Sequence, residues 1–330
     1  MSRGSSGAGP RTADGVTGDA ALTVGIDIGG TSVRGAVVDA DGRMLTTVRA
    51  FTPDTVRATE DLLVSVIDEL AAAHRVTAVG LAVAGFVSVD RQRVMFAPHL
   101  AWREDPVPAR ISARVGLPVT MDHDVNSAAW AEYRLGAAVN SPLALLLALG
   151  TGIGAGLVAD GEIQRGAHGV APELGHLIVR PGGRPCPCGK RGCWERYCSG
   201  TALATSALER WAGAGRPVPD GLDADEVTGS VVARAAADGD PIATEAVREL
   251  GEWLAYGLAI IADVIDPALI VLGGGVSGAA DAFLPVAVTA LPDLVTGGRH
   301  RPLPRIDVAR FGDRAGVIGA SLLARQALSP

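Results

Sequence analysis

All four cysteines of the chain lie within one short stretch, and a histidine precedes them. The spacing Cys186-Pro-Cys188-x4-Cys193, with His176 ten residues upstream, suits a tetrahedral zinc held by one imidazole and three thiolates. Gly189 and other glycines nearby can take the positive φ angles of a tight metal-binding turn. A disulfide or a set of unrelated buried thiols is the alternative. The clustering, in a chain without secretory features, favours the metal site and a reducing compartment.

A glycine turn near the beginning of the chain could bind phosphate. Apolar runs at residues 22–28 and 33–39 flank Gly29-Gly30-Thr31, which predicts a hairpin with Asp27 at its bend. The Gly-Lys-Thr ending of a Walker loop is missing, but adjacent glycines let backbone N–H groups approach a phosphate. Asp27 could hold Mg²⁺ directly or through water. Taken alone, the motif would also fit an ordinary β-turn.

A similar pattern returns in the middle of the chain. The apolar run 143–149 leads into Gly150-Thr151-Gly152-Ile-Gly154, a strand at 157–159 and an Asp-Gly turn. Strand, glycine turn, strand and Asp-Gly therefore occur twice, which indicates two similar lobes that each present a glycine turn to one cleft. A third glycine run, Gly273-Gly274-Gly275, follows a strand at 268–272 and could approach a flat ring or a phosphate. A flexible loop is the alternative for that run.

The remaining elements indicate where a catalytic carboxylate would lie. A buried strand at 119–121 ends in Asp122-His123-Asp124, and a helix at 127–135 follows. A carboxylate at the carboxyl end of a strand, where a helix begins, lies in the usual ligand crevice of α/β sheets. Further elements are expected at residues 44–51 and 78–83 (strands), 53–74, 201–211, 227–238 and 241–263 (helices), 305–310 (strand) and 315–326 (helix).

Composition limits the class of protein. The 330 residues carry a net charge of −7, are 48% hydrophobic and contain no dense run of Lys or Arg, which argues against a nucleic-acid-binding role. No apolar run reaches the roughly 20 residues of a membrane span. Residues 1–20 are rich in Gly, Ser, Ala and Thr and are expected to form a disordered tail, not a signal peptide. We therefore expect a cytoplasmic protein with no nucleic-acid or membrane partner.

Taken together, these segments resemble the ROK family (repressor, open reading frame, kinase) of bacterial sugar kinases and regulators, from about residue 22 to 327. The zinc segment through Trp194-Glu195 is the most specific part, together with the three glycine motifs and Glu173-Leu-Gly-His176. The resemblance implies an α/β chain with the actin-like ATPase (ribonuclease H-like) fold, two lobes around a central cleft. We expect a small lobe of residues 21–126 plus 314–330, and a large lobe of residues 127–313 that carries the zinc loop.

The resemblance also implies a function and its residues. The implied reaction is ATP-dependent phosphorylation of the 6-hydroxyl of glucose, with Mg²⁺ as cofactor and a structural Zn²⁺. Asp124 matches the catalytic base, and Glu173, His176 and Glu195 match sugar ligands. The zinc ligands would be His176, Cys186, Cys188 and Cys193, with Cys198 left as a free thiol. The nucleotide would contact Asp27, Gly29, Gly30, Thr31, Thr151, Gly152, Gly154, Gly273, Gly274 and Gly275. A homodimer or homotetramer is implied as well.

Departures from the family pattern leave the choice of sugar open. The family's sugar kinases usually have Glu-Asn-Asp where this chain has Asp122-His123-Asp124, and Asn where it has His99. His99 and His123 thus replace two amides expected near the sugar. An N-acetylmannosamine, N-acetylglucosamine or fructose kinase is the alternative, as is polyphosphate as donor. A catalytically weak sugar-sensing regulator is a further alternative, although the regulators of this family carry an N-terminal DNA-binding domain that residues 1–20 do not supply.

Overall fold

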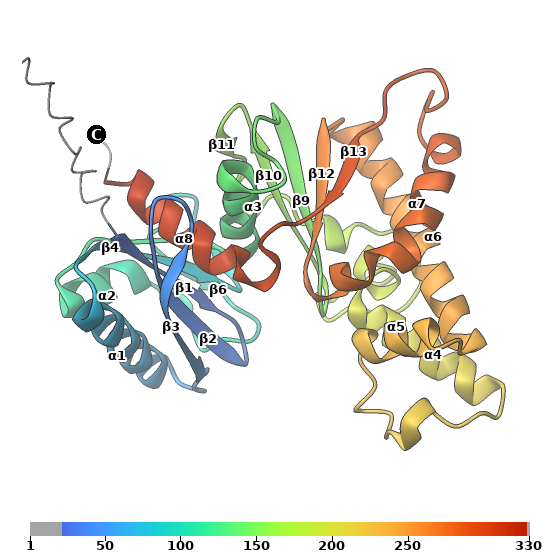
Figure 1. Cartoon of the computed structure of the whole chain (residues 1–330), viewed down its shortest axis with the longest axis horizontal. Coiled ribbons are helices and arrows are strands. Elements are labelled where there is room, and N and C mark those ends of the chain that lie inside the picture. The colour runs from blue at the N-terminus through green and yellow to red at the C-terminus, as the bar shows by residue number, and fades with distance from the viewer. Residues whose placement is uncertain (1–21, 329–330) are drawn as a thin grey trace, which may run out of the picture.

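Two five-stranded sheets organise the protein. The computed structural model describes residues 22–328, so the predicted tail at 1–20 lies outside the described residues. Figure 1 shows the two sheets standing beside each other, with helices packed against both. The first sheet belongs to the N-terminal third of the chain and the second to the remainder.

The first sheet has the strand order β3-β2-β1-β4-β8. Its strands are β1 (Leu22–Ile28), β2 (Ser32–Val38), β3 (Met44–Phe51), β4 (Val76–Val83) and β8 (Val119–His123). The central β1 pairs antiparallel with β2 and parallel with β4, and most of it is buried without alternation because both faces of the sheet are covered. The edge strand β3 alternates between half-buried and exposed residues. Helices α1 (Val56–Ala73) and α2 (Val107–Val115) enclose the core on one face.

The second sheet repeats this topology in the order β11-β10-β9-β12-β13. Its strands are β9 (Leu143–Leu149), β10 (Ile153–Ala159), β11 (Glu162–Ile163), β12 (Leu269–Gly273) and β13 (Arg305–Val308). In both sheets the first strand is central, the next two form an antiparallel meander, and the last two run parallel to it. The predicted repeat is confirmed, and the arrangement is the predicted actin-like ATPase fold.

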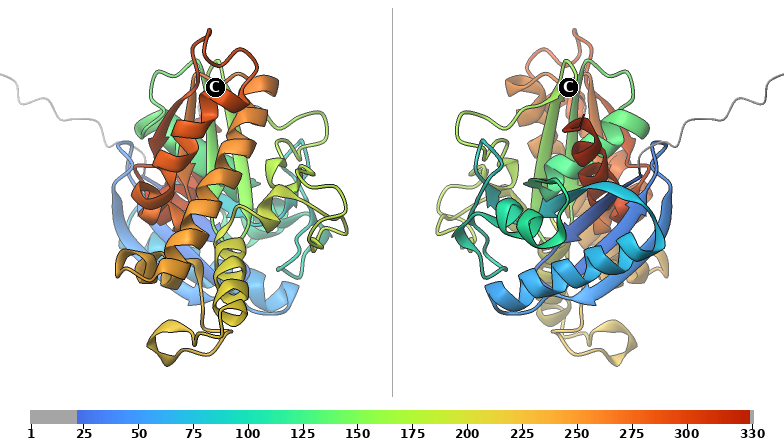
Figure 2. Two further views of the ribbon diagram at one scale, coloured as in Figure 1. Left: turned by 90° about the vertical axis from the view of Figure 1, so that its right-hand side faces the viewer. Right: turned by 90° about the vertical axis from the view of Figure 1, so that its left-hand side faces the viewer.

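Four helices cover one face of the second sheet and form the largest core. They are α4 (Gly200–Gly213), α5 (Gly229–Ala237), α6 (Pro241–Val264) and α7 (Ala280–Leu294). Each of the first three begins with a side-chain cap, from Ser199, Thr228 and Asp240, that accepts backbone N–H groups of the first turn. Figure 2 shows these helices stacked along the outer side of the sheet.

The last helix of each half packs on the sheet of the other half. Helix α3 (Asp124–Leu135) follows β8 of the first sheet but packs against β9 and β10 of the second. Helix α8 (Ala315–Gln326) follows β13 but packs against β1 and β4 of the first sheet. Glycines permit this approach, because a Cβ on Gly25 or Gly80 would collide with the backbone of α8. The two helices also pack on each other and so join the halves.

One stretch, Gly275–Leu294, is long and apolar enough by length and composition alone to cross a membrane. It comprises α7 and the 3₁₀ turn before it. Phe283, Ala287 and Leu291 of this helix are buried in the core that α6 also lines, and α7 packs along α6. One face of α7 therefore belongs to this core.

The structure departs from the sequence-based predictions in several places. The small sheet of β5 (Phe86–Val87), β6 (Val94–Phe96) and β7 (Arg103–Asp105) is not predicted, because strands of two or three residues leave no readable periodicity. Helix α2 is not predicted either, and neither is α7, whose two internal prolines read as breaks. Asp27 lies inside β1, paired with Arg34 and Ala82, and not at the bend as predicted, because β4 extends the ladder past it.

Candidate active site

A cavity of about 320 Å³ lies between the two sheets and collects residues from seven separate segments. All six side chains predicted to contact a sugar line it: His99, His123, Asp124, Glu173, His176 and Glu195. They come from the loop after β6, the junction of β8 and α3, and two 3₁₀ turns, η1 (Leu174–His176) and η2 (Trp194–Arg196). Gly152, Gly154 and Gly274 line the same cavity from the second half.

Asp124 is the first residue of α3, directly after β8. One carboxylate oxygen, Oδ1, accepts the Val125 N–H at 2.8 Å and lies 3.1 Å from His123 Nε2. The side chain remains about a third exposed (35%), so a hydroxyl could still reach the carboxylate. His123, one of the two departures from the family pattern, therefore lies against the predicted base itself.

A buried ion pair anchors the strand that carries Asp124. The Asp122 side chain is 2% exposed, and its Oδ2 accepts Arg165 Nε at 3.0 Å and a second guanidinium nitrogen at 2.5 Å. Its Oδ1 accepts the His123 backbone N–H and the Asn126 amide. Arg165 follows β11 of the second sheet, so this pair connects the two halves two residues from Asp124. The sequence pattern singles out Asp122 but gives no sign of its partner.

Glu173 and Glu195 supply carboxylates on the opposite side of the cavity. Glu195 Oε2 accepts the Ile153 N–H at 3.3 Å, and a Cβ at Gly152 would collide with this oxygen, so the β9–β10 turn lies directly against Glu195. Burial raises the pKa of Glu173; His123 and His176 oppose the rise, while Asp124 and Glu195 add to it. The two carboxylates can each accept hydroxyl hydrogens, which suits a polyol.

The two nitrogens of His176 face different groups. Nδ1 lies 3.7 Å from Cys186 Sγ, whereas Nε2 faces Glu173 at 3.9 Å. The ring therefore stands between the cysteine cluster and the cavity. Nδ1 also lies 3.7 Å from Glu195 Oε1, which places both carboxylates around one imidazole.

The cysteine cluster has the dimensions of a zinc site. The ligand atoms of His176, Cys186, Cys188 and Cys193 all lie within 4.8 Å of one another. Cys188 Sγ and Cys193 Sγ are 3.6 Å apart, close to the roughly 3.5–3.8 Å between ligands of a tetrahedral zinc. Burial raises the pKa of the Cys186 thiol to about 12, so a thiolate there requires a nearby cation. Cys198 lies elsewhere, fully buried in the core of the second half.

The first glycine turn lies against His99, which lines the 320 Å³ cavity. Gly30 packs so closely on His99 that a Cβ at position 30 would lie 2.5 Å from the His99 Cβ. Gly29 and Thr31 complete the turn, with Gly29 N–H donating to the Ser32 carbonyl. Other predicted nucleotide residues do not line the 320 Å³ cavity: Asp27, Gly29, Gly30, Thr31, Thr151, Gly273 and Gly275.

The carboxyl group of Asp27 has a strongly raised pKa. Burial raises the pKa of Asp27 to about 7; the Asp124 carboxylate adds to the rise and Arg34 opposes it. The N-terminal turn of α8 lies close by, because a Cβ on Gly316 would come within 3.0 Å of the Asp27 carboxyl carbon. A buried carboxyl beside Asp124 is a suitable ligand for a divalent cation, whose charge would favour the ionised form.

A second cavity, of about 420 Å³, opens beside Gly275. Residues of α5, including Ser230 and Arg234, and of the start of α7 form its walls. Gly274, with φ +83°, turns the chain here, and a Cβ at this position would strike the Leu149 backbone. Sequence reasoning finds the glycines but not Ser230 and Arg234, because nothing in α5 marks it as a neighbour of this turn.

Comparison with known proteins identifies the family of this chain. The model of the ROK family matches residues 23–327. The chain belongs to the ROK family. This ROK chain is 38% identical to the glucokinase of Streptomyces coelicolor, over 92% of its own length and 98% of the relative's. It is 33% identical to the glucokinase of Halalkalibacterium halodurans, over 92% and 94%.

A solved structure agrees with both relatives. The ROK family glucokinase from Streptomyces griseus, determined in complex with glucose and AMPPNP, superposes with a TM-score of 0.84 at 39% identity. The match covers 92% of this ROK chain and 99% of the other. The predicted family membership and fold are therefore confirmed.

Proposed function

We propose that this protein is a glucokinase that transfers the γ-phosphoryl group of ATP to the 6-hydroxyl of glucose. The observation that carries the proposal is the cavity that Asp124 shares with Glu173, His176 and Glu195. Gly152, Gly154 and Gly274 of the second and third glycine runs also line it. Its volume of about 320 Å³ suits a monosaccharide. The similarity to glucokinases over more than nine-tenths of the chain supports the same sugar and donor.

Asp124 serves as the base in this proposal. Its carboxylate orients the 6-hydroxyl and takes its proton while the oxygen bonds to the γ-phosphorus and the bond to ADP breaks. Glucose 6-phosphate and ADP leave, and the proton passes to solvent. Most of the rate enhancement comes from alignment and charge neutralisation, so Asp124 needs no unusual basicity. Mg²⁺, when bound, supplies positive charge at the phosphates, and Asp27 is the residue that we assign to it.

The sugar would be held by Glu173, Glu195, His176, His123 and His99. The carboxylates accept hydroxyl hydrogens, and His176 donates from Nε2 when Nδ1 faces a structural zinc. That zinc would be held by His176, Cys186, Cys188 and Cys193, and four protein ligands leave no open position for a reacting water. The adenosine would occupy the cavity beside Gly275, between α5 and α7.

The decisive experiment is a coupled ADP-release assay on a panel of hexoses. With ATP and Mg²⁺, glucose should give the highest kcat/KM, ahead of N-acetylmannosamine, N-acetylglucosamine and fructose. A parallel series with polyphosphate tests the donor. Preferred turnover of an N-acetylhexosamine would reassign the protein to that branch, and no turnover of any sugar would favour a sugar-sensing regulator.

Replacing Asp124 by Asn tests the catalytic assignment. The variant should lose at least about a thousandfold in kcat, because it lacks only the proton acceptor, while glucose still binds by calorimetry. An Asp54→Asn variant, at an exposed acid that does not line the cavity, serves as the matched control. Turnover of Asp124→Asn close to that of the control would remove Asp124 from the mechanism.

We also propose that residues 21–126 and 314–330 form the small lobe and residues 127–313 the large lobe. The protein would be located in the cytoplasm and would form a homodimer or homotetramer. Exposed apolar residues beside the zinc loop and α6, Ile178 (52%) and Tyr256 (51%), border a groove and support self-association. Light scattering during gel filtration measures the oligomeric state, and a monomer at micromolar concentration would contradict this part.

A further inference from the structure

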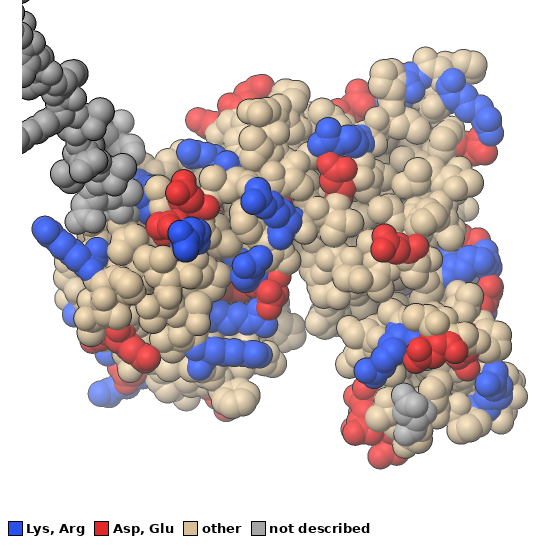
Figure 3. All heavy atoms as spheres, in the orientation of Figure 1, with Lys and Arg blue, Asp and Glu red and all other residues tan. Residues whose placement is uncertain are grey.

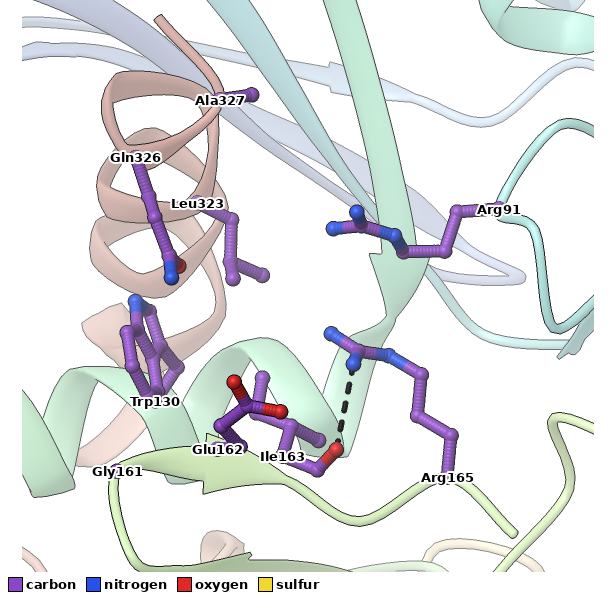
Figure 4. Close-up of a pocket in the computed structure, with 9 residues that line it drawn as sticks. All are labelled: Arg91, Trp130, Gly161, Glu162, Ile163, Arg165, Leu323, Gln326 and Ala327. Atoms are coloured by element: carbon purple, nitrogen blue, oxygen red, sulfur yellow. Dashed lines mark hydrogen bonds between the residues drawn. The ribbon is translucent and has the colours of Figure 1, made fainter. Parts of the chain in front are cut away.

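A second interlobe cavity, of about 320 Å³, shares no lining residue with the active-site cavity. It lies where β11, α3 and the C-terminal end of α8 meet the loop between β5 and β6. Figure 4 shows its walls: Trp130 and Gln326 on one side, Arg91 and Arg165 on the other, and Glu162 below. Both halves of the molecule therefore contribute side chains to it.

Two guanidinium groups enter the cavity from the same side. Figure 4 shows the Arg91 and Arg165 side chains both pointing toward α8. Arg165 is committed to Asp122 and to the Ile163 carbonyl, but Arg91 has no side-chain hydrogen bond or ion pair within residues 22–328. Arg91 also has a φ of +59°, a conformation that side-chain-bearing residues rarely adopt. An unpaired arginine beside a second cation is suited to a bound anion.

The opposite wall contains a buried donor without a partner. Trp130 is only 3% exposed, and its Nε1–H has no acceptor among the described residues. Leaving such a buried donor unpaired costs free energy, which a ligand that accepts the hydrogen bond would recover. Figure 4 shows the indole nitrogen facing the end of the exposed Gln326 side chain, at the edge of the cavity. A small rotation of Gln326 would open this donor to a ligand.

The remaining polar groups define the chemistry of the ligand. Glu162 and the amide oxygen of Gln326 are acceptors, and they lie across the cavity from the guanidinium groups. A simple anion would leave these acceptors unused and would meet the Glu162 charge. A molecule with an anionic group at one end and hydroxyls at the other satisfies both walls. The volume admits a molecule about the size of a monosaccharide derivative.

We propose that this cavity is a binding site for a small hydroxylated anion, of the sugar phosphate or sugar acid class. The anionic group contacts Arg91 and Arg165, and the hydroxyls contact Glu162, Gln326 and the Trp130 N–H. Because Arg165 also holds Asp122, a bound anion competes with that carboxylate and loosens the anchor of the strand that ends beside Asp124. Occupancy therefore lowers kcat without competing with glucose.

The test measures binding by calorimetry on the full chain with glucose and a non-hydrolysable ATP analogue present, so that the active site is filled. The probes are glucose 6-phosphate, gluconate and inorganic phosphate, which separate phosphate from carboxylate and test the need for hydroxyls. Glucose 6-phosphate or gluconate should bind saturably and more tightly than inorganic phosphate. An absence of saturable binding by all three, or equal binding of all three, overturns the proposed ligand class.

Matched variants assign the binding to this cavity. Arg91→Asn should weaken it at least about tenfold, or 1.4 kcal/mol, because Asn tolerates the same backbone conformation but lacks the cation. Arg75→Asn, at an exposed arginine outside the cavity, should leave binding unchanged. Trp130→Phe, which removes the N–H together with part of the buried ring, should weaken binding severalfold. Equal affinity in Arg91→Asn and Arg75→Asn overturns the site, and these binding results do not depend on which sugar the enzyme phosphorylates.

Kinetics test the coupling. The preferred probe should lower kcat of the original chain with little change in the glucose KM, and this effect should disappear in Arg91→Asn but persist in Arg75→Asn. Ordinary product inhibition would be equal in both variants. Inhibition that is competitive with glucose, or equal in both variants, overturns the coupling through Arg165.

Discussion

His123 is the residue that most distinguishes this cavity from the family pattern. Its Nε2 lies 3.1 Å from the carboxylate assigned as base, so it restricts both the rotation of Asp124 and the space beside the sugar. His123→Asn should therefore change the ratio of kcat/KM values for glucose and N-acetylmannosamine by about tenfold. His300→Asn, at an exposed histidine after α7, is the control. An unchanged ratio would show that His123 does not contact the sugar.

Asp27 should make stability depend on pH. The pKa of this carboxyl is near 3.8 as a free side chain and about 7 in the fold. Between those values the folded chain binds more protons than the unfolded chain, so stability falls as pH rises through this window. Asp27→Asn removes the effect.

The measurement is the difference in melting temperature between Asp27→Asn and the original chain, without nucleotide or Mg²⁺. This difference should increase between about pH 5 and pH 8, by a few degrees if the linked free energy is 1 kcal/mol or more. Asp54→Asn should give a flat difference over the same range. A flat difference for Asp27→Asn as well would mean that Asp27 ionises normally in the fold.

The sequence predicts those site residues that lie in local motifs. Asp124 stands at a strand–helix junction, and His176 and the cysteines lie within one short segment, so chain neighbours indicate them. The roles of Glu173 and Glu195 as sugar ligands are predicted only from the family resemblance. Arg165, Ser230 and Arg234 enter their sites only through the packing of distant elements, and no local pattern marks them. The sequence does not predict the raised pKa of Asp27 either, because that pKa depends on burial and on the charge of Asp124.

At the scale of elements, the zinc loop positions two of the proposed sugar ligands. Cys186 Sγ contacts Glu195 Oε1 at 3.4 Å and approaches His176, so loss of the metal should disturb both side chains. Metal analysis of the purified protein should give about one zinc per chain. Chelation or Cys188→Ser should raise the glucose KM more than the ATP KM.

Cys198→Ala provides the comparison for the zinc experiment. This cysteine is fully buried but lies outside the cluster, so its loss should affect stability and leave zinc content and the KM ratio intact. Folded, active protein without zinc would contradict the metal assignment. Equal changes in both KM values would mean that the loop supports the whole fold and not the sugar site in particular.

The spacing of apolar residues predicts most of the long helices and strands correctly and misses the short strands. The strand expected at 143–149 and the helix expected at 315–326 match β9 and α8 at both ends, because uninterrupted apolar patterns define them. The strands β5 to β7 pair only with one another, and each is two or three residues long, which is too short to show a readable period. The prolines of α7 mislead for a different reason, since core packing keeps the helix intact.

At the scale of the whole molecule, the pair of Arg165 and Asp122 joins the halves. Arg165→Met would leave Asp122, which is 2% exposed, without its counter-charge, and should cost about 3–5 kcal/mol of folding free energy. Asp122→Asn combined with Arg165→Met should recover part of that loss, because no unpaired charge remains. Urea unfolding of the two single variants and the double variant gives the coupling energy.

Additive losses in that cycle would mean that the two residues act independently. A matched pair for comparison is Arg301 and Asp266, whose ion pair is exposed and should contribute less than about 1 kcal/mol.

The two glycine turns of the sequence predict the repeat of architecture, but they do not predict the ion pair of Arg165 and Asp122. The ion pair joins Asp122 and Arg165, which lie 43 positions apart in the chain and belong to different halves. The sequence indicates the boundary between the halves only by the second occurrence of the strand and glycine-turn pattern.

The exchange of α3 and α8 between the sheets has a consequence for synthesis. The first sheet is made early, yet the helix that covers its inner face is made only after the whole second sheet. Until residues 315–326 leave the ribosome, β1 and β4 expose an apolar face. Gly25 and Gly80 on this face contact the backbone of α8 closely in the folded protein. A nascent chain shorter than this should bind chaperones and resist independent folding, and the N-terminal third should become native only once α8 has left the ribosome.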